Sequence, residues 1–150
     1  MRKIGVFLIA IITLFVSECY SQNAKSYNSI EELAKGVVQI MIDFPSMSEE
    51  QWINMFLPSF KIAKSENKLA ISGMDSYEKM TEEEAIEFYK KRYKEFKEEI
   101  RELNIDCSKF KYEGYVIRDR VNVYFSYNGE EIIRDCGSFE YNGKYYLIGI

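Results

Sequence analysis

Two Asn-Gly pairs, Asn128-Gly129 and Asn142-Gly143, most constrain the fold of this 150-residue chain. Each pair lies between runs in which aromatic and β-branched residues alternate with polar ones. Asn and Gly both tolerate the positive φ angles of a type I′ turn, so this pattern indicates a β-hairpin. With a further turn at Asp119-Arg120, the C-terminal part is predicted to form an antiparallel meander of four strands, at about 110–118, 121–127, 130–141 and 144–150.

The turn positions also fix an expected strand register. Val121 should face Cys136, and Cys136 should face Gly149. The aromatic residues that follow Gly137 then have the wrong parity for the core face, so Gly137 is the expected site of a bulge that changes the phase. Gly114 is expected to do the same in the first strand.

Three predicted helix starts in the first two thirds of the chain share one sequence motif. Ser29–Glu32, Ser48–Gln51 and Thr81–Glu84 each have the S/T-x-x-E/Q spacing of a capping box, in which the two side chains bond each other's backbone N–H groups. The first helix is predicted from about Ile30 to Ile42, and Pro45 should stop it.

The second helix should begin near Glu49, and Leu57-Pro58 is expected to break it, with a further short turn after the break. Residues 67–80 are predicted to form a loop. The third helix carries an apolar stripe with spacings of three and four residues, which is typical of a helix that covers a core. The members of this stripe are Ile86, Tyr89, Tyr93, Phe96, Ile100 and Leu103.

Helices followed by a meander predict an α+β fold, in which three N-terminal helices pack on one face of the C-terminal antiparallel sheet. The helices should occupy about 29–104 and the sheet about 110–150. We expect one domain over 22–150, because about 129 residues suit a single modest core.

The first 21 residues are predicted to be a secretory signal peptide. Arg2 and Lys3 precede thirteen uncharged residues, 4–16, a length typical of a signal and too short to span a bilayer. Cleavage after Ser21 would leave an exported protein, periplasmic or extracellular. Two alternatives stay open: a lipid on Cys19, which would attach the protein to the envelope although Glu18 does not fit a lipobox, and an uncleaved anchor.

The mature chain would keep two cysteines, Cys107 and Cys136. An even pair in an exported protein suggests a disulfide. If Arg118 faced Val121, however, Cys136 would lie eleven residues along the sheet from Cys107. That is about 36 Å at ~3.3 Å per residue, so either the pair is unbonded or the first hairpin is misread.

Composition excludes several function classes. The chain has no histidine, which rules out Ser-His-Asp and Cys-His nucleophiles and histidine-ligated zinc. Loss of the signal would leave 18 basic and 23 acidic residues, a net charge of −5, which lacks the basic footprint of nucleic-acid binding. We find no acidic metal loop and no phosphate or nucleotide motif, so we predict no metal, no cofactor and no catalytic residue.

Seven of the twelve tyrosines lie between 110 and 150, where β-propensity and core packing account for most of them. The binding candidates are Tyr124, Arg134 and Tyr145. Arg134 is predicted on the core face beside Val123, where it could equally be a structural charge.

The closing segment Ser138-Phe-Glu-Tyr-Asn-Gly-Lys-Tyr-Tyr-Leu-Ile-Gly-Ile150 resembles the final hairpin of the cystatin-like, nuclear-transport-factor-like α+β roll. Together with Ser21-Gln22 at the end of the signal, it is also similar to small uncharacterised exported proteins of Bacteroidota. Enzymes of that roll use His-Asp or Asp-Tyr pairs. The first pair is impossible here, and no residue can be assigned to the second.

The leading hypothesis is therefore a non-enzymatic exported binding module for a small apolar ligand, held between helices and curved sheet, or for a protein partner. One alternative is an isomerase or hydrolase based on Asp and Tyr, which needs a buried carboxylate beside a tyrosine hydroxyl in a cleft. Another is an envelope-attached interaction lipoprotein, with the membrane reached only through the signal segment or a lipid on Cys19.

Overall fold

The fold is α+β, as the sequence predicts, and the computed structural model describes residues 24–69 and 75–150. The predicted signal peptide and Cys19 lie outside the described residues. Helices α2 (Ile30–Asp43), α3 (Glu49–Ser65), α4 (Asp75–Glu78) and α5 (Glu82–Glu102) precede most of the sheet. The strands are β1 (Ser26–Tyr27), β2 (Lys111–Ile117), β3 (Val121–Tyr127), β4 (Glu130–Tyr141) and β5 (Lys144–Gly149).

The described sheet has five antiparallel strands in the order β1-β5-β4-β3-β2, one strand more than predicted. The additional strand is β1, which pairs with β5 and has only two residues. Both Asn-Gly pairs form the predicted turns, with φ between 51° and 86° at all four residues. The first hairpin differs from the prediction, because Ile117 rather than Arg118 faces Val121 and the loop has three residues.

The register between β3 and β4 is confirmed, with Val121 facing Cys136. The β4–β5 register is as predicted from the Asn142-Gly143 turn as far as Ser138, which faces Leu147. Beyond that pair the prediction was wrong by one residue, since Gly137 and not Cys136 faces Gly149. The shift occurs between Gly137 and Ser138, and Ile148 of β5 is the extra residue that it leaves between two pairs. The expected irregularity at Gly114 is confirmed, because the register of β2 also shifts there.

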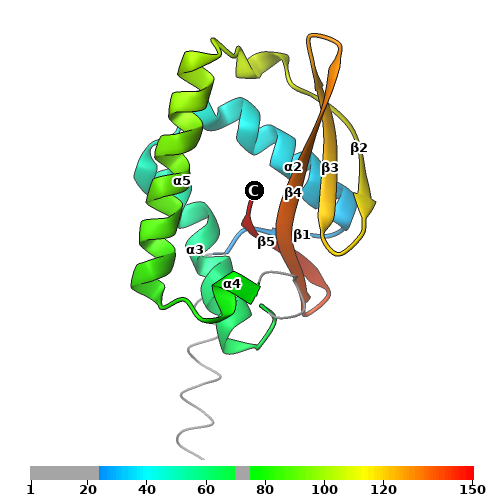
Figure 1. Cartoon of the computed structure of the whole chain (residues 1–150). Helices are drawn as coiled ribbons and strands as arrows, with labels where there is room; N and C mark the ends of the chain where they lie inside the picture. The colour runs from blue at the N-terminus through cyan, green and yellow to red at the C-terminus, as the bar shows by residue number, and fades with distance from the viewer. Residues whose placement is uncertain (1–23, 70–74) are drawn as a thin grey trace, which may run out of the picture.

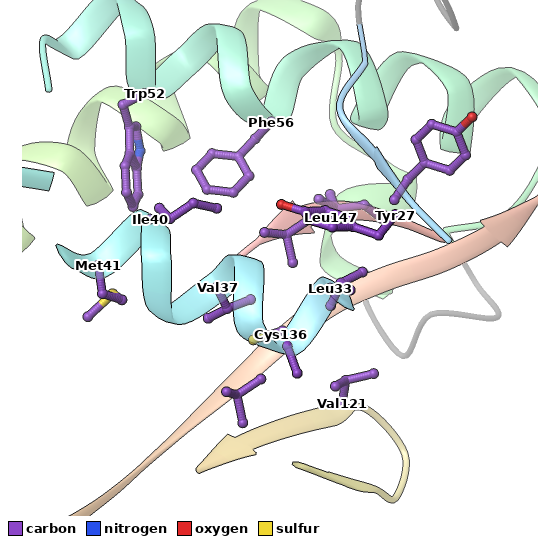
Figure 2. Packing of buried hydrophobic residues seen from close by; sticks show 14 of the residues in the cluster. Tyr27, Leu33, Val37, Ile40, Met41, Trp52, Phe56, Val121, Cys136 and Leu147 are labelled. Carbon is purple, nitrogen blue, oxygen red and sulfur yellow. The ribbon is translucent and has the colours of Figure 1, made fainter. Parts of the chain in front are cut away.

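Helix α2 lies against β2, β3 and β5, and α3 lies between β5 and α5 (Figure 1). Buried side chains from α2, α3 and the sheet meet in one core, where Cys136 and Val121 approach Val37 and Leu33 of α2 (Figure 2). Four consecutive residues of β5, 146–149, are buried, so this strand is covered on both faces. Because both faces are covered here, Phe139 is buried although its position in β4 points to the face opposite Cys136. Its ring stacks on that of Tyr146.

Two helix predictions need correction. Helix α3 continues through Pro58, although proline removes a helical hydrogen bond. Phe56 before Pro58 and Phe60 after it are both fully buried, and this packing outweighs the local preference for a break. Leu103 was predicted as the last member of the apolar stripe on the third helix. It is instead the C-cap of α5 and is 65% exposed, so it does not belong to the core.

The capping boxes at Ser48 and Thr81 are complete, with both reciprocal hydrogen bonds formed. At the first box Ser29 caps α2, but the Glu32 carboxylate accepts hydrogen bonds from Asn28 instead of reaching back to the cap. The region predicted as a loop contains the short helix α4, and residues 70–74 lie outside the described part.

Candidate functional site

A cleft of about 660 Å³ separates the N-terminal half of α5 from β4 and the end of β5. The last residue, Ile150, lies between these walls (Figure 1). Volumes of about 300–1,000 Å³ are typical of small-molecule sites. The cleft combines apolar and charged side chains, and its lining residues are Tyr77, Phe88, Arg92, Arg120, Ile133, Arg134, Asp135, Gly137, Gly149 and Ile150.

A smaller cavity of about 70 Å³ adjoins the cleft and shares Arg92, Arg134 and Ile150 with it. Its other lining residues are Met41, Trp52, Glu95, Phe96 and Glu99, so it reaches from the cleft towards the core. A single water needs roughly 15 Å³ on this scale, so the cavity has room for more than one small polar group.

The cleft wall formed by α5 is held in place by tyrosine hydroxyl groups. Tyr89 donates a hydrogen bond of 2.8 Å to the carbonyl oxygen of Ile148, and Tyr93 donates one of 2.8 Å to the carbonyl oxygen of Met47. Burial raises the pKa of Tyr89 well above its usual value, so its hydroxyl stays protonated and remains a donor. The Tyr89 bond ties α5 to the end of β5, on the other side of the cleft, and the Tyr93 bond ties α5 to the segment before α3.

Arg134 connects the two spaces. Its register position opposite Val123 is as predicted, on the face of β4 that turns towards the helices. One terminal nitrogen, Nη2, lies 3.7 Å from Glu99 Oε2, and the guanidinium lies over the Phe96 ring at 5.4 Å from its centroid. Its Nε is buried and has no hydrogen-bond partner among the described residues.

Trp52 lines the small cavity from α3 and is only 3% exposed. Its ring packs edge-on against Phe44 and Phe56, with centroid distances of 5.1 and 4.9 Å. The indole Nε1 is buried and, like Arg134 Nε, finds no acceptor in the described parts of the chain. Buried donors are nearly always satisfied in native proteins, so these two N–H groups, together with the Ser59 hydroxyl, are exceptions among the described side chains.

The acidic residues at the small cavity already face cations. Glu99 faces Arg134, and Glu95 lies 3.3 Å from Arg92 Nη1 and 3.8 Å from Lys91 Nζ. These pairs are between about 30% and 73% exposed, so each adds little to stability. The rim therefore mixes both signs of charge above a largely apolar interior.

The structure does not bring the three predicted binding residues together. Arg134 lines the cleft, but Tyr124 is absent from its lining, because it points to the face of β3 opposite the buried Val123. Tyr145 faces Tyr27 of β1, away from the cleft. Sequence reasoning missed Trp52 as a site residue, because its helical position marked it as core and no pattern reports an unsatisfied N–H.

The two candidates for a disulfide, Cys107 and Cys136, are buried free cysteines. Cys107 begins a 3₁₀ turn at the end of β3 where Tyr127 lies, whereas Cys136 faces Val121 at the other end. The seven residues of β3 span about 20 Å at ~3.3 Å per residue, far more than the 7 Å or so that a disulfide allows between Cα atoms. Burial raises the pKa of Cys136 to about 12.

Among the side chains that the structure describes, Ser59 is the only buried polar residue, so none of their carboxylates is buried. A tyrosine hydroxyl does meet a carboxylate between Tyr141 and Glu66, at 3.4 Å, but neither residue lines the cleft. Within residues 24–69 and 75–150, no cluster of three or more potential ligand side chains could hold a metal ion. No helix in these ranges is long and apolar enough to cross a membrane.

No protein-family model matches this chain, and neither a curated protein nor a solved structure does.

Proposed function

We propose that this protein is an exported, non-enzymatic binding module that takes a small organic ligand in the cleft between α5 and β4. The observation that carries the proposal is a cleft of about 660 Å³ beside a cavity of about 70 Å³, with which it shares the lining residues Arg92, Arg134 and Ile150. Their lining offers apolar surface and a few converging polar groups, the usual composition of a ligand site.

The site differs from the apolar interior pocket expected from the sequence. The core between α2 and the sheet is occupied by buried side chains, and the cleft lies at its margin, with arginines and carboxylates at the rim. A ligand with an apolar body and a polar end suits this lining better than a wholly apolar one.

The test is a fragment screen by two-dimensional NMR on the mature chain. We expect the fragments that bind to shift amide signals of cleft residues, such as Phe88, Ile133 and Gly137. Shifts centred instead on the exposed apolar residues of the edge strand β2, Tyr115, Val116 and Ile117, would contradict the cleft and favour a protein-partner surface.

A matched pair of variants makes the test specific. Phe88→Ala removes a half-buried aromatic ring from the cleft wall on α5, and Tyr115→Ala removes a 38% exposed aromatic ring from β2. We expect Phe88→Ala to weaken fragment binding at least tenfold and Tyr115→Ala to leave it within twofold. Equal effects of the two variants would refute the proposal.

A further inference from the structure

Strand β2 leaves one long edge of the described sheet open. It pairs only with β3 and forms the outer border of the sheet (Figure 1). Five large apolar side chains are exposed in the described part of the chain, and three of them are consecutive on this strand: Tyr115 at 38%, Val116 at 40% and Ile117 at 57%. Soluble proteins usually protect an open edge with charged residues or proline. The segment 114–117 has neither.

The hydrogen bonds of the β2–β3 hairpin show which backbone groups point to this edge. Ile117 faces Val121, and a bond of 3.0 Å closes the loop between them, from the N–H that follows Ile117 to the carbonyl that precedes Val121. In an antiparallel ladder such a bond flanks a pair that is not itself hydrogen-bonded. The N–H and C=O groups of Ile117 therefore point away from β3. The same holds for Tyr115, two residues earlier, while those of Val116 point towards β3.

We propose that β2 pairs with β2 of a second copy of this chain, antiparallel and around a two-fold axis at Val116. In this register Tyr115 of each copy faces Ile117 of the other. The outward N–H and C=O groups of these two residues then form four hydrogen bonds across the axis. The paired residues all follow the irregularity before Gly114, so the new ladder is regular.

The apolar side chains are self-complementary in this register. Tyr115 and Ile117 lie on the helix-covered face of the sheet, because the β3 residues that they face are buried. An aromatic ring opposite a β-branched side chain is a favourable cross-strand pair, and the dimer forms two such pairs. Val116 lies on the other face and meets Val116 of the second copy. A second copy of the chain therefore covers all three exposed residues.

The charges at the two ends of the segment favour the same arrangement. Gly114 of one copy faces Arg118 of the other, and because glycine has no side chain, the guanidinium can reach the neighbouring Glu113. The Glu113 carboxylate accepts a hydrogen bond from the Ser126 hydroxyl and has further lone pairs. Arg118 takes part in no ion pair among the described residues. The hairpin loop 118–120, with two arginines and one aspartate, has a net charge of +1 and so attracts this carboxylate.

The interface is short, so the dimer should depend on concentration. Stable interfaces bury about 1,200–2,000 Å² in total, more than two strand segments of this length provide. The pairing is closed, because it uses the β2 edge of both copies, and β1 at the opposite edge has only two residues. Strand β3 separates β2 from β4, so the proposal does not depend on the ligand cleft.

Sedimentation equilibrium of the mature protein, from micromolar to millimolar concentration, tests the proposal. We expect a monomer–dimer equilibrium that Val116→Lys weakens at least tenfold, because this change places two like charges at the two-fold axis. Leu103→Lys is the matched control, since it changes a 65% exposed apolar residue at the end of α5. It should leave the dimer dissociation constant within twofold. A monomer at every concentration, or equal effects of the two variants, would overturn the proposal.

Amide hydrogen exchange tests the register in the unmodified protein. The amides of Tyr115 and Ile117 point to the open edge in the monomer and are bonded in the dimer. They should exchange more slowly as the concentration rises, in proportion to the fraction of monomer that remains. The amide of Val116 already points towards β3 and should not change. Equal slowing at all three positions, or at none, would rule out this register.

Charge reversal distinguishes a contact between copies from an effect on folding. Glu113→Arg leaves two positive charges at each end of the interface, and Arg118→Glu leaves two negative ones. Each variant alone should dimerise at least threefold more weakly than the wild type. An equimolar mixture should recover the lost affinity, because opposite charges again meet in the mixed dimer. A mixture that associates no more tightly than either variant alone would contradict the two-fold arrangement.

Discussion

Substituting Gly36 with alanine should destabilise the protein, although alanine is the better helix former. Gly36 lies in α2, and the ring of Tyr27 from β1 covers it. A Cβ at position 36 would lie 2.8 Å from both Cζ and the hydroxyl oxygen of Tyr27, closer than real Cβ contacts allow. The ring must then move, and since Tyr27 is only 7% exposed its displacement disturbs packed surroundings.

Two opposing contributions set the size of this change in the free energy of unfolding. Replacing glycine with alanine inside a helix gains about 1 kcal/mol from propensity. Overpacking a filled site costs about 1–3 kcal/mol. Taking the middle of that range, we expect Gly36→Ala to lower the free energy of unfolding by about 1 kcal/mol.

The effect of Gly36→Ala on the free energy of unfolding should change sign once the Tyr27 ring is removed. In a Tyr27→Ala background nothing opposes the new methyl group, so Gly36→Ala should raise the free energy of unfolding by about 1 kcal/mol. The double-mutant cycle should then give a coupling of about 2 kcal/mol between the two positions.

Urea unfolding followed by fluorescence of the single tryptophan, Trp52, measures all four proteins. The comparison uses midpoints at unchanged m-values, so that a change in the denatured state is not mistaken for a change in stability. A coupling below about 0.5 kcal/mol, the limit for independent sites, would refute the placement of β1 across α2.

Two further predictions follow from raised pKa values. Cys107 and Cys136 are buried and the pKa of both thiols is raised. Iodoacetamide should therefore label neither thiol in the native protein near neutral pH and both thiols after unfolding. Rapid labelling of either thiol in the native protein would contradict the packing. Burial also raises the pKa of Tyr27 and Tyr77 from 10.0 to about 12. As the pH rises past 10, the unfolded chain loses these protons before the folded protein does, so the thermal midpoint should fall between pH 10 and 12. Phenolate absorbance should show that these two tyrosines titrate only when the protein unfolds. Titration of both at pH 10 in the folded protein would contradict this account.

The elements that could be predicted are those encoded locally. An Asn-Gly pair specifies its turn through the φ angles that only such residues adopt readily, so both hairpins and the β3–β4 register followed from the sequence. The capping boxes at Ser48 and Thr81 fixed the starts of two helices for the same reason.

The errors arose where tertiary contacts decide. Strand β1 has two residues and no periodicity, and it exists because β5 offers it an edge. Pro58 should have broken α3, but the buried residues on both sides of it hold the helix together.

The site itself depends on long-range placement. Arg134 was predicted as a candidate because a charge stood at a core position of β4, which is a local anomaly. Trp52 was not predicted as a site residue, because a residue at its position on a helix is also expected in the core. Only the meeting of α3, α5 and β4 reveals that the two side chains share a cavity and that each has an unbonded N–H.

A crystal structure of the mature protein soaked with the tightest-binding fragment of the NMR screen tests the central claim most directly. The account predicts density for the fragment between the N-terminal half of α5 and β4, in contact with Phe88 and Arg92. A fragment bound only on the edge strand β2 would contradict it.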